Sequence, residues 1–371
     1  MDRVERRTLG GVTDETTTRA SAVDLLAGAP TYAAAMAELR AAPRRWLVTG
    51  GAGFIGSHLV EALLGLGQEV VVVLDDLSSG KLANLDDVRA RVGPDATARL
   101  DFVRGDLRDA EAVARASEGV AVVLHHAAQV SVPGSIDDPV ATHHVNATGF
   151  LHVLEAARAV DARVVYAASS ASYGDDPADV KVEDRVGRPL SPYAATKTAN
   201  EAYAAAYGQA YGVETVGLRY FNVFGPRQDP RGAYAAVIPA WIDALAQRGR
   251  CPVHGDGLTT RDFCHVANVV GANLLAATTA SSAALGGAFN VGTGERTTLL
   301  ELHDALLAAI RDARPERTAG LDPEPAFGPF RPGDVRHSCA DITRARDLLG
   351  YRPVVGLRDG IAHTLVWFLR A

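Results

Sequence analysis

Short apolar runs alternate with helical stretches along most of the chain, beginning near Arg45. Helical spacing of apolar positions is seen between the runs, for example in AEAVARAS (110–117) and TGFLHVLEAARAV (148–160). This alternation predicts parallel strands joined by right-handed crossovers. The predicted strands lie in WLVTG (46–50), EVVVVLDD (69–76), RLDFVRGDL (99–107), VAVVLHHAA (120–128), ARVVYAASS (162–170), VETVGLRYFN (213–222) and AFNVGTG (288–294). We therefore expect an α/β fold with a Rossmann-like, doubly wound parallel sheet.

The alternation becomes irregular after Asn222, where proline and glycine gather in NVFGPRQDPRGAY and later in RTAGLDPEPAFGPFRPGD. Loops of this kind are expected in a smaller α/β substrate-binding C-terminal lobe that caps the strand ends. The predicted domains are an N-terminal extension (1–43), a dinucleotide-binding domain (44–219 plus 264–296) and the lobe (220–263 plus 297–371). We expect the extension to be partly disordered, with one short amphipathic helix from about Tyr32 to Leu39 that packs on the main body.

The composition narrows the classes of protein that the chain can belong to. Of its 371 residues, 47% are apolar and 22% charged, which is ordinary for a globular protein. A net charge of −7 gives no reason to expect nucleic acid as a partner, and no apolar run reaches the ~18 residues that a membrane span needs. The three cysteines are unpatterned, which favours buried free thiols in a reducing cytoplasm. We expect a cytoplasmic protein with no membrane or nucleic-acid partner.

A glycine-rich turn follows the first predicted strand and opens a helix. GGAGFIG places Gly50, Gly53 and Gly56 three residues apart, so that the backbone can approach a pyrophosphate at the helix N-terminus. Asp75 ends the second strand, 19 residues after Gly56, where a carboxylate can accept both adenosine ribose hydroxyls and would repel a 2′-phosphate. The sequence therefore predicts NAD as the cofactor, in preference to NADP.

Further cofactor contacts are expected at the same edge of the sheet. Phe54 and Ile55 contribute amide groups at the helix N-terminus. Asp106, after the third strand, is placed to touch adenine, although a helix-capping role explains it nearly as well. Leu107 beside it and Ala127 after the fourth strand complete the predicted cofactor set.

Two histidine pairs, His125–His126 and His143–His144, raise the possibility of a metal site. Adjacent side chains on a strand point to opposite faces, and no cluster of carboxylates or cysteines accompanies either pair. We therefore predict local hydrogen-bonding roles and no metal.

The segment SPYAATK (191–197) combines a helix start with a tyrosine and a lysine on one face. Ser191 is a good N-cap and Pro192 suits the first helical position, while Tyr193 and Lys197 are four residues apart. Ionising a phenol at pH 7 requires about 4 kcal/mol, which a cation about 4 Å away supplies at an effective dielectric near 20. Ser169 and Ser170 end the predicted strand ARVVYAASS, at the edge of the sheet where ligands bind. We predict Tyr193 as a general base with Ser169 and Lys197 as its catalytic partners.

These motifs resemble the extended short-chain dehydrogenase/reductase superfamily, in particular the UDP-sugar 4-epimerases and most of all the UDP-N-acetylglucosamine 4-epimerases. The resemblance covers about Tyr32 to Phe368. It rests on VTGGAGFIGSH, GDLRD, LHHAA, YAASSASYGD, SPYAATK, LRYFNVFGPRQDP, GAYAAVIP, GDGLTTRDF and FRPGDVRHS. Several of these motifs lie outside the cofactor half, so the match is more specific than a dinucleotide turn alone.

The resemblance implies a mechanism in which Tyr193 takes the proton of the sugar 4-hydroxyl while the C4 hydride passes to NAD⁺. Lys197 would lower the tyrosine pKa and hold the nicotinamide ribose, and Ser169 would bridge the two hydroxyls. The 4-keto sugar would then turn over and take the hydride back on its other face. The implied substrate contacts are Ser131, Ser169, Ser170, Asn222, Arg261, Arg331, Asp334 and Ser338. The family also implies a homodimer that uses the Tyr193 helix and a role in surface glycan supply.

The sugar remains open at this point. The gating residue of the family aligns with Ser338, whose small side chain favours UDP-N-acetylglucosamine and UDP-N-acetylgalactosamine, with the plain UDP-hexoses as further candidates. A UDP-glucuronate 4-epimerase is an alternative if Arg227 or another cation binds the carboxylate. Dehydratases and decarboxylases resemble one another in having an acid beside the active-site serine, and none occurs here before Asp175. Val130 and Gly134 depart from the expected small and basic residues.

A different class of function is an NAD-bound sensor that does not turn substrate over. Such relatives tend to lose the tyrosine or the lysine, and this chain has both.

Overall fold

The computed structural model describes residues 20–230, 236–247, 249–315, 324–330 and 335–369. A seven-stranded sheet with the order β12-β7-β5-β4-β1-β2-β3 runs through its centre, and every pairing between neighbours is parallel. The strands are β1 (Arg45–Thr49), β2 (Val70–Asp75), β3 (Leu100–Arg104), β4 (Val122–His125), β5 (Arg163–Ser169), β7 (Thr215–Tyr220) and β12 (Ala288–Val291). The predicted fold class is confirmed, with one strand in each of the seven predicted runs.

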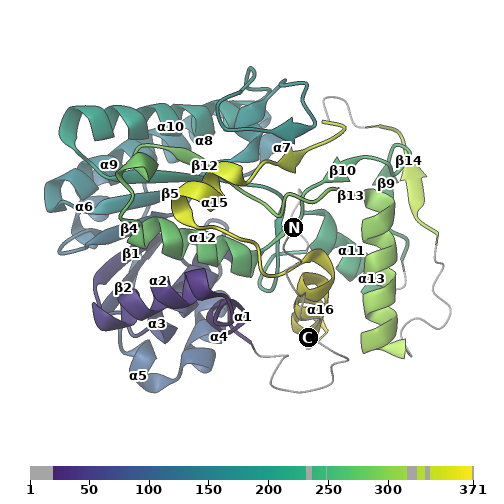
Figure 1. Ribbon diagram of the computed structural model, residues 1–371, viewed down its shortest axis with the longest axis horizontal. Coiled ribbons are helices and arrows are strands. Elements are labelled where there is room, and N and C mark those ends of the chain that lie inside the picture. Colours follow the sequence, from purple (N-terminus) through teal and green to yellow (C-terminus); the bar gives the residue numbers. More distant parts are fainter. Residues whose placement is uncertain (1–19, 231–235, 248, 316–323, 331–334, 370–371) are drawn as a thin grey trace.

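Two layers of helices cover the sheet (Figure 1). The inner strands are almost wholly apolar and buried, as expected for a parallel sheet with helices on both faces. One face carries α3 (Phe54–Gly65), α4 (Leu82–Val92) and α12 (Val266–Thr278), and the other carries α6 (Ala110–Ala116), α9 (Gly149–Val160) and α10 (Pro192–Tyr211). The strand order reverses between β1 and β4, and this reversal opens the crevice at the carboxyl edge.

A second, smaller core lies to one side of the sheet (Figure 1). Trp241, Ile242, Leu306 and Ile361 belong to it, all fully or almost fully buried. Its elements are α11 (Val237–Ala246), β9 (Pro252–His254), β10 (Thr260–Arg261), β13 (Thr297–Thr298), α13 (Leu299–Ala313), β14 (Ala326–Gly328) and α16 (Leu357–Phe368). The exact division into 44–219 plus 264–296 and 220–263 plus 297–371 remains a prediction.

The remaining helices and strands are short and connect these two parts or lie at their borders. They are α5 (Pro94–Thr97), α7 (Val132–Asp137), α8 (Pro139–His143), η2 (His144–Thr148), η3 (Ser170–Tyr173), β6 (Val180–Lys181), β8 (Val223–Phe224), β11 (Cys264–His265), η4 (Ser282–Ala284), β15 (Cys339–Ala340) and α15 (Thr343–Leu349). Cys251, Cys264 and Cys339 are buried and unpaired, as predicted. Among the described residues, no helix combines the length and the apolar character that a membrane crossing requires.

The described part of the N-terminal extension forms α1 (Ala22–Leu26) and α2 (Pro30–Ala41), which pack against α12 (Figure 1). Tyr32 is fully buried, and its hydroxyl donates to the Arg352 carbonyl over 2.5 Å. A Cβ on Gly271 of α12 would lie 2.6 Å from the Tyr32 ring, so the absence of a side chain there makes room for this contact. The predicted helix that packs on the main body is confirmed.

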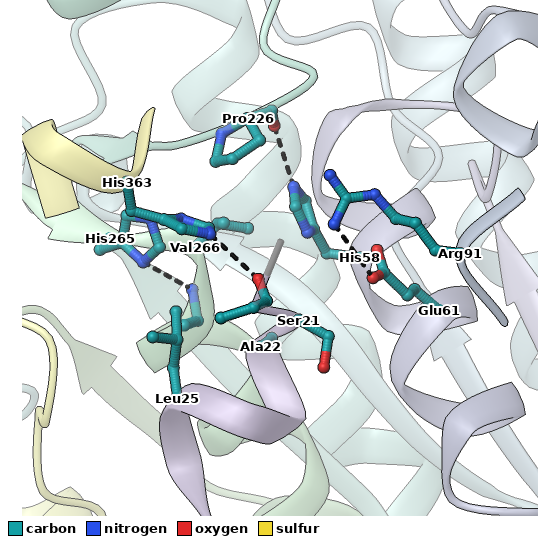
Figure 2. Close-up of a pocket in the computed structure, with 12 residues that line it drawn as sticks. Ser21, Ala22, Leu25, His58, Glu61, Arg91, Pro226, His265, Val266 and His363 are labelled. Atoms are coloured by element: carbon teal, nitrogen blue, oxygen red, sulfur yellow. Dashed lines mark hydrogen bonds and ion pairs between the residues drawn. The ribbon is translucent and has the colours of Figure 1, made fainter. Parts of the chain in front are cut away.

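His265 and His363 form a pair that binds Ala20, the first described residue of the extension (Figure 2). His363 Nε2 lies 3.0 Å from the Ala20 carbonyl oxygen, and His363 Nδ1 lies 3.2 Å from His265 Nε2. His265 Nδ1 accepts from the Ala267 amide over 3.2 Å, so its proton is on Nε2 and is donated to His363. His363 therefore donates from Nε2 to Ala20, and the contact joins the extension to α12 and α16.

Candidate active site

The glycine-rich turn between β1 and α3 can be built only from glycines at two of its positions. Gly50 has φ +70°, and a Cβ there would lie 2.7 Å from the Ala127 amide nitrogen. A Cβ on Gly56 would lie 2.1 Å from the Gly50 carbonyl oxygen. Gly53 is the N-cap of α3 and provides no side-chain cap for the first-turn amides, which include those of Phe54 and Ile55. This bare helix start, in a turn that a Cβ would fill, fits the pyrophosphate of a dinucleotide.

Asp75 lies directly beneath this turn. Its carboxylate accepts from the Ala52 amide over 3.0 Å and from the Leu77 amide over 2.9 Å. Burial raises the pKa of Asp75, and these two hydrogen bonds oppose that shift. The neighbouring Asp76 accepts from the Ser78 amide and hydroxyl instead, and its charge adds to the rise in the pKa of Asp75. The binding of adenosine ribose hydroxyls by Asp75 stays a prediction.

The other predicted cofactor residues surround the same edge. Asp106 forms an ion pair with Arg108, and the hydrogen bonds from that guanidinium lower the pKa of Asp106. The helix cap of α6 is Asp109, so capping does not explain Asp106. Leu107 is buried and its carbonyl accepts from His152 Nδ1 over 2.7 Å. The Ala127 amide donates to Thr49 Oγ1 over 3.2 Å and lies against the glycine turn.

The Tyr193 helix starts as the sequence predicts. Ser191 Oγ accepts from the Ala194 amide over 3.1 Å, and Pro192 occupies the first turn of α10. The Tyr193 amide, which has no partner within the helix at this position, donates to Ser135 Oγ of α7 over 3.1 Å. The backbone at Tyr193 is thus fixed from two sides.

Tyr193 and Ser169 are joined by a hydrogen bond between their side chains, and Lys197 lies beside them. The Lys197 ammonium is 5.9 Å from the centroid of the Tyr193 ring and donates to the Ala167 carbonyl over 2.8 Å. Burial lowers the pKa of Lys197 to about 8. The three predicted catalytic side chains therefore meet at the end of β5.

The pKa of Tyr193 differs from the expectation. Burial raises it above its ordinary value, and the hydrogen bond from Ser169 only opposes this shift. The prediction placed a cation about 4 Å from the phenol, whereas the Lys197 ammonium is turned toward a backbone carbonyl. Lys197 is therefore not among the groups that lower the pKa of Tyr193 in this structure.

Asn146 is a positioning residue that the sequence analysis missed. Its side-chain oxygen accepts from the Gln129 amide over 2.8 Å, and its nitrogen donates to the Gln129 carbonyl over 3.0 Å. The same nitrogen lies 3.2 Å from Thr196 Oγ1 of α10. Asn146 therefore ties the loop after β4 to the Tyr193 helix. Asn146 is buried in η2, whose sequence HVNAT gave no local signal for this role.

An open cleft of about 430 Å³ lies against the smaller core, beyond the end of β7. Asn222 and Arg261, the predicted diphosphate contacts, both line it, together with His254 and Trp241. Asn222 is exposed and donates to the Asp262 carbonyl over 3.1 Å. Two predicted substrate residues, Arg331 and Asp334, lie outside the described residues.

The remaining predicted substrate residues are partly exposed. Ser338 is bonded through its amide to the Thr260 carbonyl over 3.3 Å, next to Arg261. Ser131 caps α7 and accepts from the Gly134 amide over 2.9 Å, so its hydroxyl proton is left to donate. Ser170 begins η3, immediately after Ser169.

Asp262 was also missed, although it follows Arg261 directly. Its buried carboxylate accepts from the Thr293 amide and hydroxyl, each over 2.7 Å, and from the amides of Gly294 and Ala340 over 2.9 and 3.2 Å. Burial raises its pKa, and the four hydrogen bonds oppose the shift. Asp262 thus connects the strand that carries Arg261 to the loop after β12 and to β15, the strand that follows Ser338.

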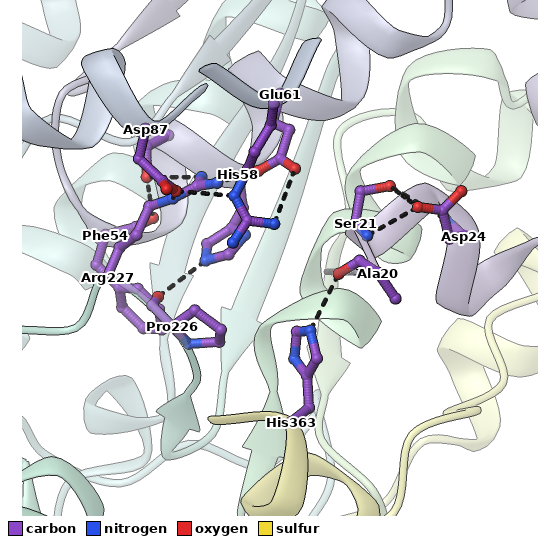
Figure 3. A network of polar contacts seen from close by, with 12 residues as sticks. Ala20, Ser21, Asp24, Phe54, His58, Glu61, Asp87, Pro226, Arg227 and His363 are labelled. Atoms are coloured by element: carbon purple, nitrogen blue, oxygen red, sulfur yellow. Dashed lines mark hydrogen bonds and ion pairs between the residues drawn. The ribbon is translucent and has the colours of Figure 1, made fainter. Parts of the chain in front are cut away.

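Arg227, considered for a sugar carboxylate, is occupied elsewhere (Figure 3). Its guanidinium is buried and pairs with Glu61 and, over 2.8 Å, with Asp87. His58 lies beside this group and is bonded to the Pro226 carbonyl over 2.9 Å. A sugar carboxylate could reach Arg227 only by displacing two acidic partners.

The pair His125–His126 takes part in local hydrogen bonds. His125 Nδ1 lies 2.9 Å from Thr49 Oγ1, and His126 Nε2 lies 2.8 Å from the Tyr220 hydroxyl. The rings of His143 and His144 contact each other edge to face. Within the described ranges, no group of three or more histidine, cysteine or acidic side chains could hold a metal ion.

Comparison with known proteins places these features in a family. The model of the NAD dependent epimerase/dehydratase family matches residues 46–292. UDP-glucose 4-epimerase of Mycolicibacterium smegmatis is 42% identical over 327 residues, covering 87% of this chain and 98% of that protein.

Two solved structures are similar over nearly their whole length. UDP-N-acetylglucosamine 4-epimerase from Methanobrevibacter ruminantium, in complex with UDP-N-acetylmuramic acid, matches with a TM-score of 0.79 and 34% identity, covering 88% of this chain and 99% of that one. UDP-glucose 4-epimerase of Thermus thermophilus, in complex with NAD, matches with a TM-score of 0.73 and 40% identity over the same shares. The chain belongs to the NAD-dependent epimerase/dehydratase family of the short-chain dehydrogenase/reductase superfamily.

Proposed function

We propose that the protein is a UDP-hexose 4-epimerase whose main substrates are UDP-N-acetylglucosamine and UDP-N-acetylgalactosamine, with the plain UDP-hexoses as further substrates. The observation that carries this proposal is that Ser169, Tyr193 and Lys197 meet at the end of β5, next to the strand that leads to Asn222. Asn222, two residues after the register partner of Ser169, lines a cleft together with Arg261, and this cleft supports a site for an extended anionic ligand.

Tyr193 accepts the proton of the sugar 4-hydroxyl, with Ser169 as the bridge between the two oxygens. The chemistry that NAD supplies when bound is reversible hydride acceptance at C4, together with a positive charge near the phenol. Because burial alone raises the pKa of Tyr193, that charge and Lys197 are both needed for the phenol to ionise near neutral pH. NAD is held by the turn of Gly50, Gly53, Phe54, Ile55 and Gly56, by Asp75, and by Asp106, Leu107, Ala127 and Lys197.

The UDP stays in place while the 4-keto sugar turns over. Arg261 and Arg331 suit this role because a guanidinium can bond two diphosphate oxygens at once. Asn222 adds a neutral donor at the end of β7, and Asp334, Ser131 and Ser170 complete the proposed contacts. The volume of the cleft, about 430 Å³, supports a sugar that can rotate between two orientations.

The acids nearest to Ser169 support epimerisation over dehydration. Asp175 accepts from the Arg188 amide over 2.7 Å. Asp176 is buried and paired with Lys181 over 3.5 Å and with Arg185 over 3.1 Å. Both carboxylates are thus engaged in the loop after η3, and chemistry at C5 of the sugar would need a free acid or base.

The choice of an N-acetylated sugar rests on Ser338. Its side chain is small and half-buried, and it follows His337, which pairs with Thr260. A relative of this chain is a UDP-N-acetylglucosamine 4-epimerase. UDP-glucuronate remains the alternative substrate, although the pairing of Arg227 with Glu61 and Asp87 weakens it.

Incubation of the purified chain with UDP-N-acetylglucosamine, UDP-glucose and UDP-glucuronate, followed by proton NMR, tests this proposal. We expect the 4-epimer from UDP-N-acetylglucosamine and none from UDP-glucuronate. Formation of a 4-keto-6-deoxy product, or conversion of UDP-glucuronate alone, would contradict it.

We also propose a cytoplasmic homodimer that uses α10. Tyr203 and Tyr211 lie on this helix with exposed fractions of 41% and 56%, and exposed aromatic side chains of this kind are common in interfaces. Light scattering of the native chain and of Tyr203→Arg tests the dimer: a monomeric native chain would contradict it.

A further inference from the structure

Glu201 and Arg219 form a buried ion pair one helical turn beyond the catalytic lysine. Arg219 Nε donates to one carboxylate oxygen of Glu201 over 2.9 Å, and Arg219 Nη2 donates to the other over 2.7 Å. The two side chains are only 15% and 6% exposed, and neither has a part in the mechanism above. Because burying two charges costs desolvation energy that their attraction often fails to repay, stability alone is a weak explanation for the pair.

Glu201 lies beside Lys197 because both side chains extend from one face of α10 toward the sheet. The two residues are four apart, a spacing that brings side chains of one helix together. The Lys197 ammonium donates to the carbonyl of Ala167 on β5, and Glu201 is bonded to Arg219 on β7. Arg219 is the register partner of Ala168, which directly follows Ala167. The ammonium and the carboxylate are thus anchored at neighbouring positions of two adjacent strands.

The carboxylate of Glu201 acts on the charge of Lys197. Burial lowers the pKa of Lys197 to about 8, and the charge of Glu201 opposes this shift. A buried ammonium without a negative neighbour tends to lose its proton. A titration midpoint one pH unit lower would leave about half of the Lys197 side chains neutral at pH 7.

Arg219 fixes the position of the Glu201 carboxylate. Its third nitrogen, Nη1, donates to the Glu183 carbonyl over 3.1 Å, and its guanidinium carbon lies 4.9 Å from the centroid of the Tyr173 ring. The guanidinium is therefore held on three sides and engages both carboxylate oxygens of Glu201. Lys197 thus has a negative charge nearby while its ammonium stays on a backbone carbonyl.

The histidines and tyrosines around Lys197 are neutral. Burial lowers the pKa of His125 and of His126 on β4, and the charge of Lys197 adds to both shifts. Burial also raises the pKa of the surrounding phenols, which are those of Tyr166, Tyr173, Tyr193 and Tyr220. These groups add no charge beside the ammonium near neutral pH.

The remaining charged groups are bonded elsewhere or lie at the surface. The Glu183 carboxylate accepts from the Asn290 amide over 2.9 Å, and burial raises its pKa. His152 of α9 is bonded to the Leu107 carbonyl over 2.7 Å. The other titratable side chains of α7, α8, η2 and α9 are exposed, namely Asp137, Asp138, His143, His144, Glu155 and Arg158. Within the described core, the Glu201 carboxylate is the negative charge that acts on Lys197.

We infer that Glu201 is a positioning residue for the catalytic lysine: its carboxylate, held by Arg219, keeps Lys197 protonated inside the closed core. The proposed mechanism needs this charge, together with that of NAD, to ionise Tyr193 and to hold the nicotinamide ribose. The purpose of the pair thus rests on the proposed function, whereas the protonation of Lys197 can be measured without NAD or sugar.

Lysine NMR of the full chain, freed of nucleotide and without sugar, tests this directly. The sequence has three lysines, Lys81, Lys181 and Lys197, so carbon-13 lysine gives three Cε signals, and Lys197→Met identifies the one of interest. The native Lys197 signal should titrate near pH 8. Glu201→Gln leaves the charge of Arg219 unbalanced beside the ammonium, so the midpoint should fall by about one pH unit.

Further variants separate charge from packing. Arg219→Met leaves the Glu201 carboxylate without its partner, so the midpoint should rise above that of the native chain. The double variant leaves no buried charge unpaired, and its midpoint should lie below the native value and above that of Glu201→Gln. Glu155→Gln removes an exposed acid that accepts from Tyr207 of α10 over 2.6 Å, and as the control it should leave the midpoint unchanged.

A Lys197 midpoint that is unchanged or raised in Glu201→Gln would overturn the inference. If that variant does not fold, the same result in the double variant would overturn it. In the NAD-loaded chain, the pH profile of kcat/KM should move to lower pH in Glu201→Gln, and a profile that stays in place would show that the charge does not serve the reaction. A chain with the expected NMR midpoints but no epimerisation would refute the proposed function alone, so the two proposals fail separately.

Discussion

At the glycine turn the backbone is so closely packed that a methyl group on Gly56 would lie 2.1 Å from a carbonyl oxygen, whereas the cleft beside Asn222 and Arg261 leaves about 430 Å³ open. The turn is built from backbone contacts within one strand–helix unit. The cleft is lined by side chains from both cores, and Asp262 fixes its wall through four hydrogen bonds.

The difference matches what an epimerase must do with its two ligands. The cofactor has to keep one position through both half-reactions, so a rigid backbone cradle is favourable. The sugar has to present opposite faces in turn, so its pocket must be wide while the diphosphate is held. Changes on the tight side should therefore affect cofactor binding, and changes on the open side should affect the choice of sugar.

The largest effect is expected where the two regions meet. Tyr193→Phe removes the proton acceptor but keeps the ring, so kcat should fall about 10³-fold with NAD still bound. Tyr203→Phe, on the exposed face of the same helix, is the matched control and should keep full kcat. Steady-state kinetics and the absorbance of bound nucleotide measure both. Unchanged turnover in Tyr193→Phe would exclude Tyr193 as the base.

On the tight side, Gly56→Ala should weaken NAD binding about 100-fold, because the new methyl group must displace the turn. Gly65→Ala is the control, since a Cβ on Gly65, the last residue of α3, would have no other atom within 4 Å. Calorimetric titration with NAD compares the two variants. Equal affinities would mean that the turn does not hold the dinucleotide.

On the open side, Asp262→Asn should raise KM about 30-fold with a smaller change in kcat. In this variant a side-chain NH2 group replaces one carboxylate oxygen and faces backbone N–H groups, which are also donors. Each hydrogen bond lost in this way costs about 1–3 kcal/mol. Asp256→Asn is the control, because Asp256 is paired with Arg336 at the surface. KM for the UDP-sugar is the readout, and an unchanged KM would show that Asp262 does not hold Arg261 in place.

Ser338→Tyr should narrow the open side for one class of sugar. We expect kcat/KM for UDP-N-acetylglucosamine to fall about tenfold relative to UDP-glucose, since steric exclusion in a pocket is worth about 1–3 kcal/mol. The plain hexose serves as the internal control. An equal fall in kcat/KM for both substrates would show that Ser338 does not select the sugar.

The smallest expected effect is a dependence of stability on pH. The pKa of Lys197 is lowered from 10.5 to about 8, so the unfolded chain holds this proton more tightly. Stability from this group is present above pH 10.5 and is lost as the pH falls through about 8, which amounts to about 1 kcal/mol between pH 9 and pH 7. Lys197→Met should lack this increment in denaturant unfolding. An identical pH dependence in both proteins would contradict the assignment.

Local features of the fold and site were predictable from the sequence, and features made by distant contacts were not. The glycine turn and the cap formed by Ser191 and Pro192 depend on neighbours within a few residues, so their residue types specify them. The hydrogen bond between His126 and Tyr220 spans 94 residues, and the contacts of Asp262 span 31 to 78. Only the packed sheet brings such residues together.

The orientation of Lys197 shows the same limit. Helical spacing places it on the face of Tyr193, as predicted, but the hydrogen bond to the Ala167 carbonyl on β5 determines where the ammonium points. The partners of Arg227 likewise come from α3 and α4, which the spacing of its own motif does not reveal.

The central claim is that the configuration at C4 is inverted because the sugar turns over while the cofactor stays in one position. It is tested most directly by incubating the native chain with UDP-N-acetylglucosamine in D2O. Returning the hydride to the carbon it left predicts UDP-N-acetylgalactosamine with hydrogen retained at C4 and C5, seen by proton NMR. Dehydration across C5 and C6 would instead require loss of the C5 proton and its exchange with solvent. Deuterium at C5, or no 4-epimer, would contradict the account.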